Sequence, residues 1–435
     1  MALLPLLATI CTHAAVHVGP SATLGPVEVV RQSGVVNCGP AFPPPHEPGQ
    51  HGDLDIPDAP SRAWVVPGPP DASTDQSQNM SVTLLATHTQ ARYDIGSSLD
   101  DLHHDCRVVF NSSWNAEPSQ FNDRIWLMSP YVSEPGASTI YALAHMEFHG
   151  WSDVTNHSLC VDPTTTQPFV KDPEPNLCWY NAVVLLVSND SGRTFQHARA
   201  PPNHLVATVP YRYNKSAAPG VGYGDMSNII IRREDGYLYV FTHSRNDYGE
   251  MKRGVCLMRT RPEDLGDPTS WRGWGGGGSF NVTFVNPYNT SVDGHTDDGD
   301  AASHVCVPLQ SMSLMPHFIG YSTYYARYIA VGSTVQKGRV GMGFALSDNL
   351  IEWDSLTVLR WNNESAGVKE AYASILDLES WNATPGANLD AVGKDSGFLY
   401  YMHSYRCNLT SFNCLDIWRQ RVSFAGANNS NNNLD

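Results

Sequence analysis

The chain has 435 residues, of which 41% are hydrophobic and only 16% are charged, so it can bury a large core. Its 35 glycines and 30 prolines are typical of many short strands joined by turns. The net charge of −16 argues against nucleic acid and anionic membranes as partners, because both need a basic surface. No long stretch shows a helical period with matching caps, so we expect an all-β protein.

The chain begins with a short apolar run, MALLPLLATICTHAA, that ends in small residues. Such a run is typical of a secretory signal peptide, although the usual basic start is missing. Asn-x-Ser/Thr sequons are frequent along the rest of the chain, as on a glycosylated surface. No later stretch reaches the roughly 18 apolar residues that a membrane span needs. We therefore predict a secreted, glycosylated protein that acts as a monomer and does not span a membrane.

The cysteine count supports export. Loss of the segment that holds Cys11 leaves eight of the nine cysteines, and an even number suits a disulfide set in an oxidising compartment. Sequence does not fix the connectivity, and our predicted pairs are Cys38–Cys106, Cys160–Cys178, Cys256–Cys306 and Cys407–Cys414.

Strand-like runs fall into five groups in chain order. Each group has a first strand, a turn and a second strand rich in aromatic and β-branched residues, and some continue into a third strand and a polar turn. The groups begin with DAPSRAWVV, NDRIWLMSPYV, DMSNIIIRREDGYLYVFTHS, SMSLMPHFIGYS and EAYASILDLES. Repetition at a period of about 60 to 80 residues indicates units that cannot bury a face alone, and a four-stranded unit of this size is a propeller blade.

We therefore predict a five-bladed β-propeller with four-stranded antiparallel blades. It should span residues 55–425, after a signal peptide (1–15) and an N-terminal extension (16–54), and before a disordered Asn-rich tail (426–435). The stretch SNDSGRTF, Ser188–Phe195, resembles the Asp box of sialidases and other propellers, a turn between the third and fourth strands of a blade. Its Asp accepts hydrogen bonds from its own turn, its Gly permits positive φ, and its Phe should pack between blades.

Five blades that open with DAPSRAW resemble the five-bladed propeller glycosidases, the arabinanase, xylosidase and invertase group. SDNLIEW is similar to their recurring third-strand turn, and GYLYVFTHS and GFLYYMHSY to their second strands. The chain also resembles secreted propeller proteins with no assigned activity. The resemblance implies a carbohydrate-active protein, either a glycoside hydrolase or a glycan-binding recognition propeller without catalysis.

Propeller geometry brings distant residues together, because first strands begin, and second strands end, at one face of the central channel. Acidic residues stand at or before the expected first strands: Asp58, Asp123, Asp225 and Glu370. Polar residues end the expected second strands: His88, Arg92, His145, Glu147, His149, His243, Arg245, Tyr405 and Arg406. We expect them to line a pocket for carbohydrate.

Glycoside hydrolysis needs two carboxyls across the scissile bond. The resembling family uses an Asp of the first blade as base, a second Asp that tunes the acid, and a Glu as acid. By local context Asp58 matches the base and Asp225 the tuning residue, with Asp123 a weaker candidate. The Glu-Gly-Pro typical of the family is absent, so the acid stays open between Glu370, which falls in the fifth blade, and Glu147.

The stretch HMEFH offers a second chemistry. Alternate strand residues share a face, so His145, Glu147 and His149 project together. They could hold a metal ion such as Ca²⁺ or Zn²⁺, bind sugar hydroxyls, transfer protons, or form a plain hydrogen-bonded strand face. We expect no required cofactor.

Four arginines could lie at the same mouth: Arg62, Arg92, Arg245 and Arg406. Guanidinium groups bind carboxylates, so an anionic sugar and a sialidase-like hydrolase, with Tyr405 as nucleophile, form a further alternative. Sialidases have six blades and an R-I-P strand that is missing here, which disfavours it. No G-x-S-x-G or H-E-x-x-H stretch points to a serine hydrolase or a zinc protease.

Overall fold

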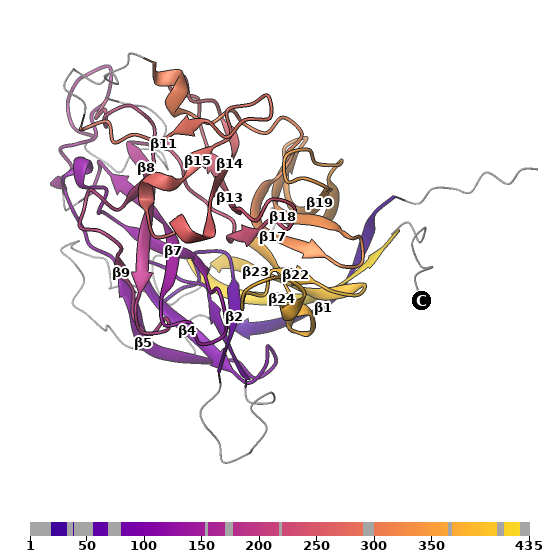
Figure 1. Ribbon diagram of the computed structural model, residues 1–435. Helices are drawn as coiled ribbons and strands as arrows, with labels where there is room; N and C mark the ends of the chain where they lie inside the picture. The colour runs from indigo at the N-terminus through magenta and orange to yellow at the C-terminus, as the bar shows by residue number, and fades with distance from the viewer. Residues whose placement is uncertain are drawn as a thin grey trace, which may run out of the picture.

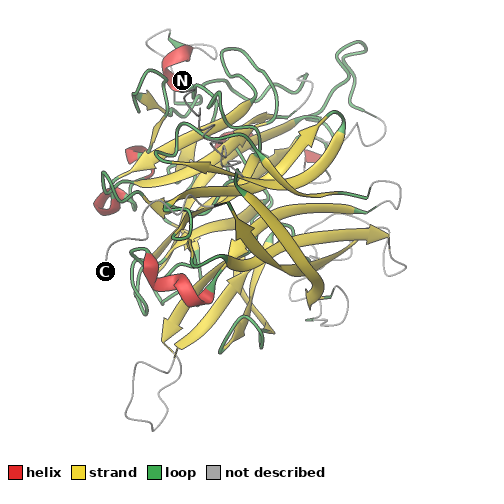
Figure 2. Ribbon diagram, turned by 90° about the vertical axis from the view of Figure 1, so that its right-hand side faces the viewer, coloured by secondary structure: helices red, strands yellow, loops and turns green. Residues whose placement is uncertain are grey.

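The computed structural model describes residues 19–32, 38, 55–67, 80–152, 155–169, 177–216, 220–289, 300–363, 368–406 and 413–426. Five separate, largely antiparallel sheets follow one another in chain order round the molecule (Figure 1). Strands make up nearly all of the regular structure (Figure 2). The predicted five-bladed β-propeller is therefore confirmed.

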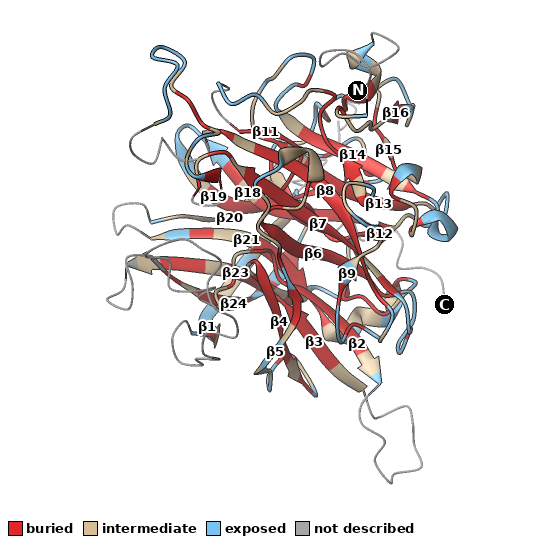
Figure 3. Cartoon of the chain, turned by 90° about the vertical axis from the view of Figure 1, so that its left-hand side faces the viewer, coloured by how far each residue is buried: buried red, intermediate tan, exposed pale blue. Residues whose placement is uncertain are grey.

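The first two blades supply much of the site described below. The first is the sheet β2 (Arg62–Pro67), β3 (Met80–Leu85), β4 (Gln90–Gly96) and β5 (His103–Asn111). The second consists of β6 (Ile125–Tyr131), β7 (Ile140–His149), β8 (Trp179–Ser188) and β10 (Leu205–Ala207), with β9 (Gln196–His197) and β11 (Val221–Gly222) also paired to β8. Strands β6, β7 and β8 are buried along nearly their whole length, as strands that face the axis or a neighbouring blade must be (Figure 3).

The third and fourth blades each carry a fifth short strand. The third is the sheet β12 (Ile230–Ile231), β13 (Leu238–Ser244), β14 (Gly254–Thr260), β15 (Arg272–Gly273) and β16 (Val282–Thr283). The fourth is β17 (Met315–Ser322), β18 (Arg327–Gln336), β19 (Arg339–Ser347) and β20 (Thr357–Trp361), with β22 (Ala391–Val392) parallel to β17. The described 3-10 helices are η2 (Pro118–Gln120), η4 (Pro262–Asp264), η5 (Pro268–Ser270), η6 (Ala301–His304) and η8 (Leu378–Ala383).

The fifth blade closes the ring with both ends of the chain. It consists of β21 (Lys369–Leu376), β23 (Ser396–Arg406) and β24 (Asn413–Ala425), and its outer strand is β1 (Ser21–Arg31). Strand β1 runs antiparallel to β24, and the Arg419 guanidinium holds Glu28 at 2.7 Å across the pair. Residues 16–54 are expected to form an extension, but residues 21–31 of that range form the outer strand of the fifth blade.

The Asp-box turn behaves as the sequence predicts. Both Asp190 carboxylate oxygens accept hydrogen bonds from Thr194, one from its backbone N–H and one from its hydroxyl, and Gly192 has φ of 84°. Phe195 is buried, and its backbone N–H donates to Val109 of the first blade at 2.7 Å. The turn therefore joins two blades and has a structural role.

Three disulfides match the predicted pairs Cys38–Cys106, Cys160–Cys178 and Cys256–Cys306. The fourth predicted pair includes Cys407, which lies outside the described residues. Within the described ranges, no helix has the length and apolar character needed to cross a membrane.

Candidate active site

Asp58 stands in the loop before β2 at one end of the channel. Its backbone N–H donates to Thr87 at 3.0 Å, which fixes the loop against the end of β3. His88 Nε2 lies 3.9 Å from Oδ2, and the Tyr372 hydroxyl donates to Oδ1 at 3.3 Å. Burial raises the pKa of Asp58 to about 6; the charges of Glu147 and Asp225 act in the same direction, while His88 and Tyr372 oppose them. A carboxyl with this pKa can hold a proton in mildly acidic solution.

Glu147 lies near the end of β7 between two imidazoles, as the alternation of HMEFH predicts. His145 Nε2 is 3.6 Å from Oε1, and His149 Nε2 is 3.0 Å from Oε2. Burial acts to raise the pKa of Glu147, but His145, His149 and Arg245 outweigh it, and the pKa lies below its ordinary value. Glu147 is therefore an ionised carboxylate whose two oxygens are both held.

Asp225 precedes β12 and is the third carboxyl at this end of the channel. It has a left-handed φ of 49°, and Nε and Nη2 of Arg245 both donate to its Oδ2, at 3.0 and 2.7 Å. Burial acts to raise the pKa of Asp225, but Arg245, His145 and His243 hold it well below its ordinary value. The preceding residue, Gly224, has no side chain because a Cβ there would collide with the His145 ring.

Tyr372 lies beside Asp58, although no pattern in the sequence marks it. Its φ is 60°, within an irregularity of β21 between Ala371 and Ser374. Its ring lies 5.4 Å from that of His317, a fully buried residue of β17 whose pKa burial lowers to about 3. A tyrosine in this position could be found only by knowing where the strand becomes irregular.

Trp126 is a second residue that sequence reasoning missed. Its buried indole lies between the two histidines next to the carboxylates, with ring centroids 5.6 Å from His88 and 6.0 Å from His145. No pattern in the sequence marks it, because its place follows from its pairing with His145 in the β6–β7 register.

Glu370 does not join the other carboxylates. Its Oε1 is held by Arg360 Nη2 at 2.8 Å and lies 3.3 Å from His403 Nδ1, and the His403 ring stacks on Trp418 at 3.5 Å. This group lies between the fourth and fifth blades. Of the two acids left open by the sequence, Glu147 is the one beside Asp58.

The four predicted arginines have different environments. Arg245 is paired with Asp225, while the buried Arg62 donates to the Met226 and Ser61 carbonyls and the Ser374 hydroxyl, with a pKa that burial lowers to about 9. Arg92 is buried, with Nη1 at 3.4 Å from Asp55 Oδ1. The backbone of Arg406 ends β23, and its side chain lies outside the described part of the structure.

The two remaining candidates adjoin the carboxylate group, His243 near Asp225 and Asp123 near His149. His243, at the end of β13, contributes to the low pKa of Asp225, and burial lowers its own pKa to about 4. Asp123 is buried beside His149, whose backbone N–H donates to Oδ2 at 3.2 Å, and Arg124 Nη1 holds the same oxygen at 2.8 Å. Asp123 is therefore a support for the Glu147 strand.

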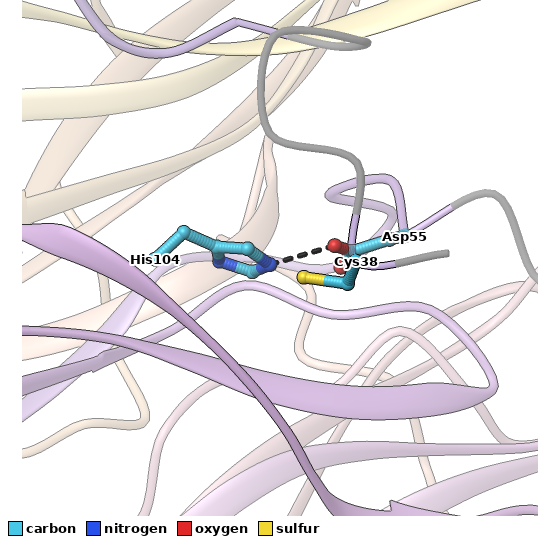
Figure 4. A group of neighbouring side chains, drawn as sticks. All are labelled: Cys38, Asp55 and His104. Carbon is cyan, nitrogen blue, oxygen red and sulfur yellow. Dashed lines mark hydrogen bonds and ion pairs between the residues drawn. The ribbon is translucent and has the colours of Figure 1, made fainter. Parts of the chain in front are cut away.

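Among the described residues, one group brings three potential metal-ligand atoms within 4.8 Å of one another: Cys38, Asp55 and His104 (Figure 4). The Cys38 sulfur is bonded to Cys106, and the His104 ring nitrogens lie 2.6 Å from Asp55 and 3.0 Å from Asp94. These contacts describe a disulfide beside a buried hydrogen-bond network. His145, Glu147 and His149 do not form such a group in the described structure.

No family model and no curated protein matches the sequence. Solved structures that match most of the chain include a Dyadobacter fermentans protein of unknown function, with 9% identity, a TM-score of 0.36 and coverage of 85% of this chain and 96% of that one. The catalytic domain of the Coprinopsis cinerea GH62 α-L-arabinofuranosidase matches with 8% identity, a TM-score of 0.38 and coverage of 88% of this chain and 95% of that one. A Lactobacillus brevis α-L-arabinofuranosidase matches with 8% identity, a TM-score of 0.40 and coverage of 78% of this chain and 86% of that one. Each likeness concerns the fold alone.

Proposed function

We propose that this protein is a secreted, glycosylated glycoside hydrolase that acts as a monomer, with Asp58 and Glu147 as its reacting carboxyls. The observation that carries the proposal is the meeting of three carboxyl groups from three blades, one with a raised pKa and two with lowered pKa values. When two carboxyls in one site have different pKa values, one can stay protonated as the acid while the other is ionised as the base.

The pKa directions favour one order of roles. Asp58 holds the proton that passes to the leaving oxygen as the glycosidic bond breaks. Glu147, already ionised, acts on the anomeric carbon, either through a water whose proton it takes or by direct attack. The charges of Asp225 and Arg245 contribute to the electrostatic field at both of these carboxyls. This order reverses the sequence-based assignment of Asp58 as base, because Glu147 is the more acidic of the two groups.

Export is supported by two observations. The apolar N-terminal run is typical of a signal peptide, and disulfides form in oxidising compartments. The pocket proposed for carbohydrate has histidine, tyrosine and tryptophan side chains around its carboxylates, which suit sugar hydroxyls and ring faces.

The test is to assay Asp58→Asn and Glu147→Gln on a panel of aryl glycosides and polysaccharides. Each change should lower turnover at least about a hundredfold on the substrate that the native protein cleaves. Asp348→Asn is the matched control, because this carboxylate is 76% exposed on the fourth blade. Native turnover in both variants would overturn the assignment, and glycan binding without turnover in the native protein would replace it with a recognition role.

A further inference from the structure

Trp179 lies beside the proposed site in a position that neither the fold nor the reaction explains. It is the first residue of β8, directly opposite His149 in the β7–β8 register. The two rings are parallel, with centroids 4.2 Å apart and planes 9° apart, and the indole is only partly buried. Because His149 Nε2 contacts Glu147 at 3.0 Å, the indole lies one side chain away from a reacting carboxylate.

Trp114 is a second partly buried indole at the same end of the propeller. It follows β5, and the Arg124 guanidinium carbon lies over its ring at 4.2 Å. Arg124 is held by Asp123, which also accepts the backbone N–H of His149. Each indole is therefore backed by a residue that is bonded to Asp123, Trp114 by the Arg124 side chain and Trp179 by His149, which is bonded through its backbone N–H.

This arrangement suits a sugar ring. A half-exposed indole with one face covered by a fixed partner presents its other surface in a set orientation, so that little side-chain freedom is lost on binding. The apolar C–H face of a sugar packs on such a surface. The Asp123–Arg124 pair behind Trp114 is buried and oppositely charged, so it presents no net charge to a sugar on that indole, and this surface favours an uncharged ring.

We propose that Trp179 and Trp114 form a second sugar-binding position beside Glu147, and that the substrate is a neutral oligosaccharide or polysaccharide of at least two rings. The inference rests on the proposed function for its orientation toward Glu147. It adds the substrate class, a chain of neutral sugars in place of a single sugar on a small aglycone.

The test measures binding by calorimetry with full-length protein carrying Asp58→Asn, so that turnover does not interfere. The probes are neutral xylo-, manno- and gluco-oligosaccharides of one to four units. Affinity should rise about tenfold between one and three units for at least one series. Adding Trp179→Ala or Trp114→Ala should remove most of that rise, while Trp179→Phe, which keeps an aromatic face, should retain it.

Trp381→Ala is the matched control, since Trp381 is a partly buried tryptophan in η8, beyond the far end of β21. Circular dichroism and thermal unfolding show whether each variant folds, and Trp114→Ala carries the test if Trp179→Ala does not. An unchanged rise with chain length in both alanine variants, or no binding of any probe, overturns the inference. A rise that is lost in the variants, in a protein without hydrolytic turnover, upholds the sugar position and overturns the proposed hydrolysis alone.

Discussion

The hydroxyl of Tyr372 donates a hydrogen bond to Oδ1 of Asp58 at 3.3 Å, and it does so from a backbone with φ of 60°. A bulky residue in this region costs on the order of 1–3 kcal/mol, so the surrounding structure must hold it there. Strand β21 belongs to the fifth blade and Asp58 precedes the first, so the bond joins the two ends of the ring. Backbone strain and a carboxyl with a raised pKa thus coincide at one point.

The native protein should lose activity as the pH rises through about 6. Asp58 is the proton donor in the proposed reaction, and its pKa is raised to about 6, so its protonated fraction falls tenfold per pH unit above that value. Glu147 stays ionised throughout this range because its pKa is lowered. The measurement is kcat/KM against pH. An acid limb near pH 6 with activity retained above it would instead make Asp58 the base.

Tyr372→Phe should move the predicted fall in activity to higher pH. The hydroxyl favours the ionised form of Asp58, so its loss raises the pKa of Asp58, by about 0.5–1 unit for a hydrogen bond of ordinary strength. Tyr401→Phe is the control, because it removes a hydroxyl that bonds to Gln420 at 3.0 Å on the neighbouring strand. Identical pH profiles for both variants would show that Tyr372 does not position Asp58.

Arg245→Met should impair both stability and catalysis. It removes two hydrogen bonds to a buried carboxylate, which costs roughly 2–3 kcal/mol of unfolding free energy. The pKa of Asp225 should rise, and the loss of the guanidinium also removes one of the charges that keep the pKa of Glu147 low. We expect a lower melting temperature and a fall in kcat/KM of about ten- to a hundredfold.

Arg259→Met is the comparison for Arg245, since Arg259 lies on β14 of the same blade and pairs with a partly exposed Asp235 at 3.5 Å. Its effect on the melting temperature should be small. Equal effects of the two changes on activity would remove Asp225 and Arg245 from the site.

The blade pattern of the sequence was sufficient to predict the fold and the proximity of several candidate site residues. Radial symmetry correctly groups Asp58, Asp225 and the HMEFH residues, because strand ends that meet at one face are set by the repeat and by alternation along a strand. The Asp box follows from local chemistry in the same way.

What the sequence could not predict depends on irregular backbone and on long-range pairing. The irregularity in β21 brings Tyr372 to Asp58 and leaves Glu370 with Arg360 and His403, and no pattern in KEAYAS marks it. Strand β1 alternates like many strands, but its partner β24 lies almost the whole chain away. Neither feature can be recognised from a short stretch of the sequence.

The closure of the ring should make the stability of the protein depend on pH. Arg31, at the end of β1, lies 3.2 Å from Asp94 of β4, and His104 of β5 lies between Asp94 and Asp55. The His104 side chain is 2% exposed, and although burial opposes it, the two carboxylates raise the pKa of His104 to about 8. A folded pKa above the ordinary 6.5 gives stability that is complete below pH 6.5 and is lost as the pH rises through 8.

His104→Gln should therefore flatten this dependence. The free energy of unfolding of the native protein should fall by about 2 kcal/mol between pH 6.5 and 8.5, since a change of one in the pKa is worth about 1.4 kcal/mol. The melting temperature should fall with it. His103→Gln is the matched control, because the neighbouring imidazole on β5 is exposed. If thermal unfolding follows the same pH curve in the native protein and both variants, His104 is not the group that couples pH to closure of the ring. Arg92, and not His104, would then be the residue that fixes Asp55 in the segment that leads to Asp58.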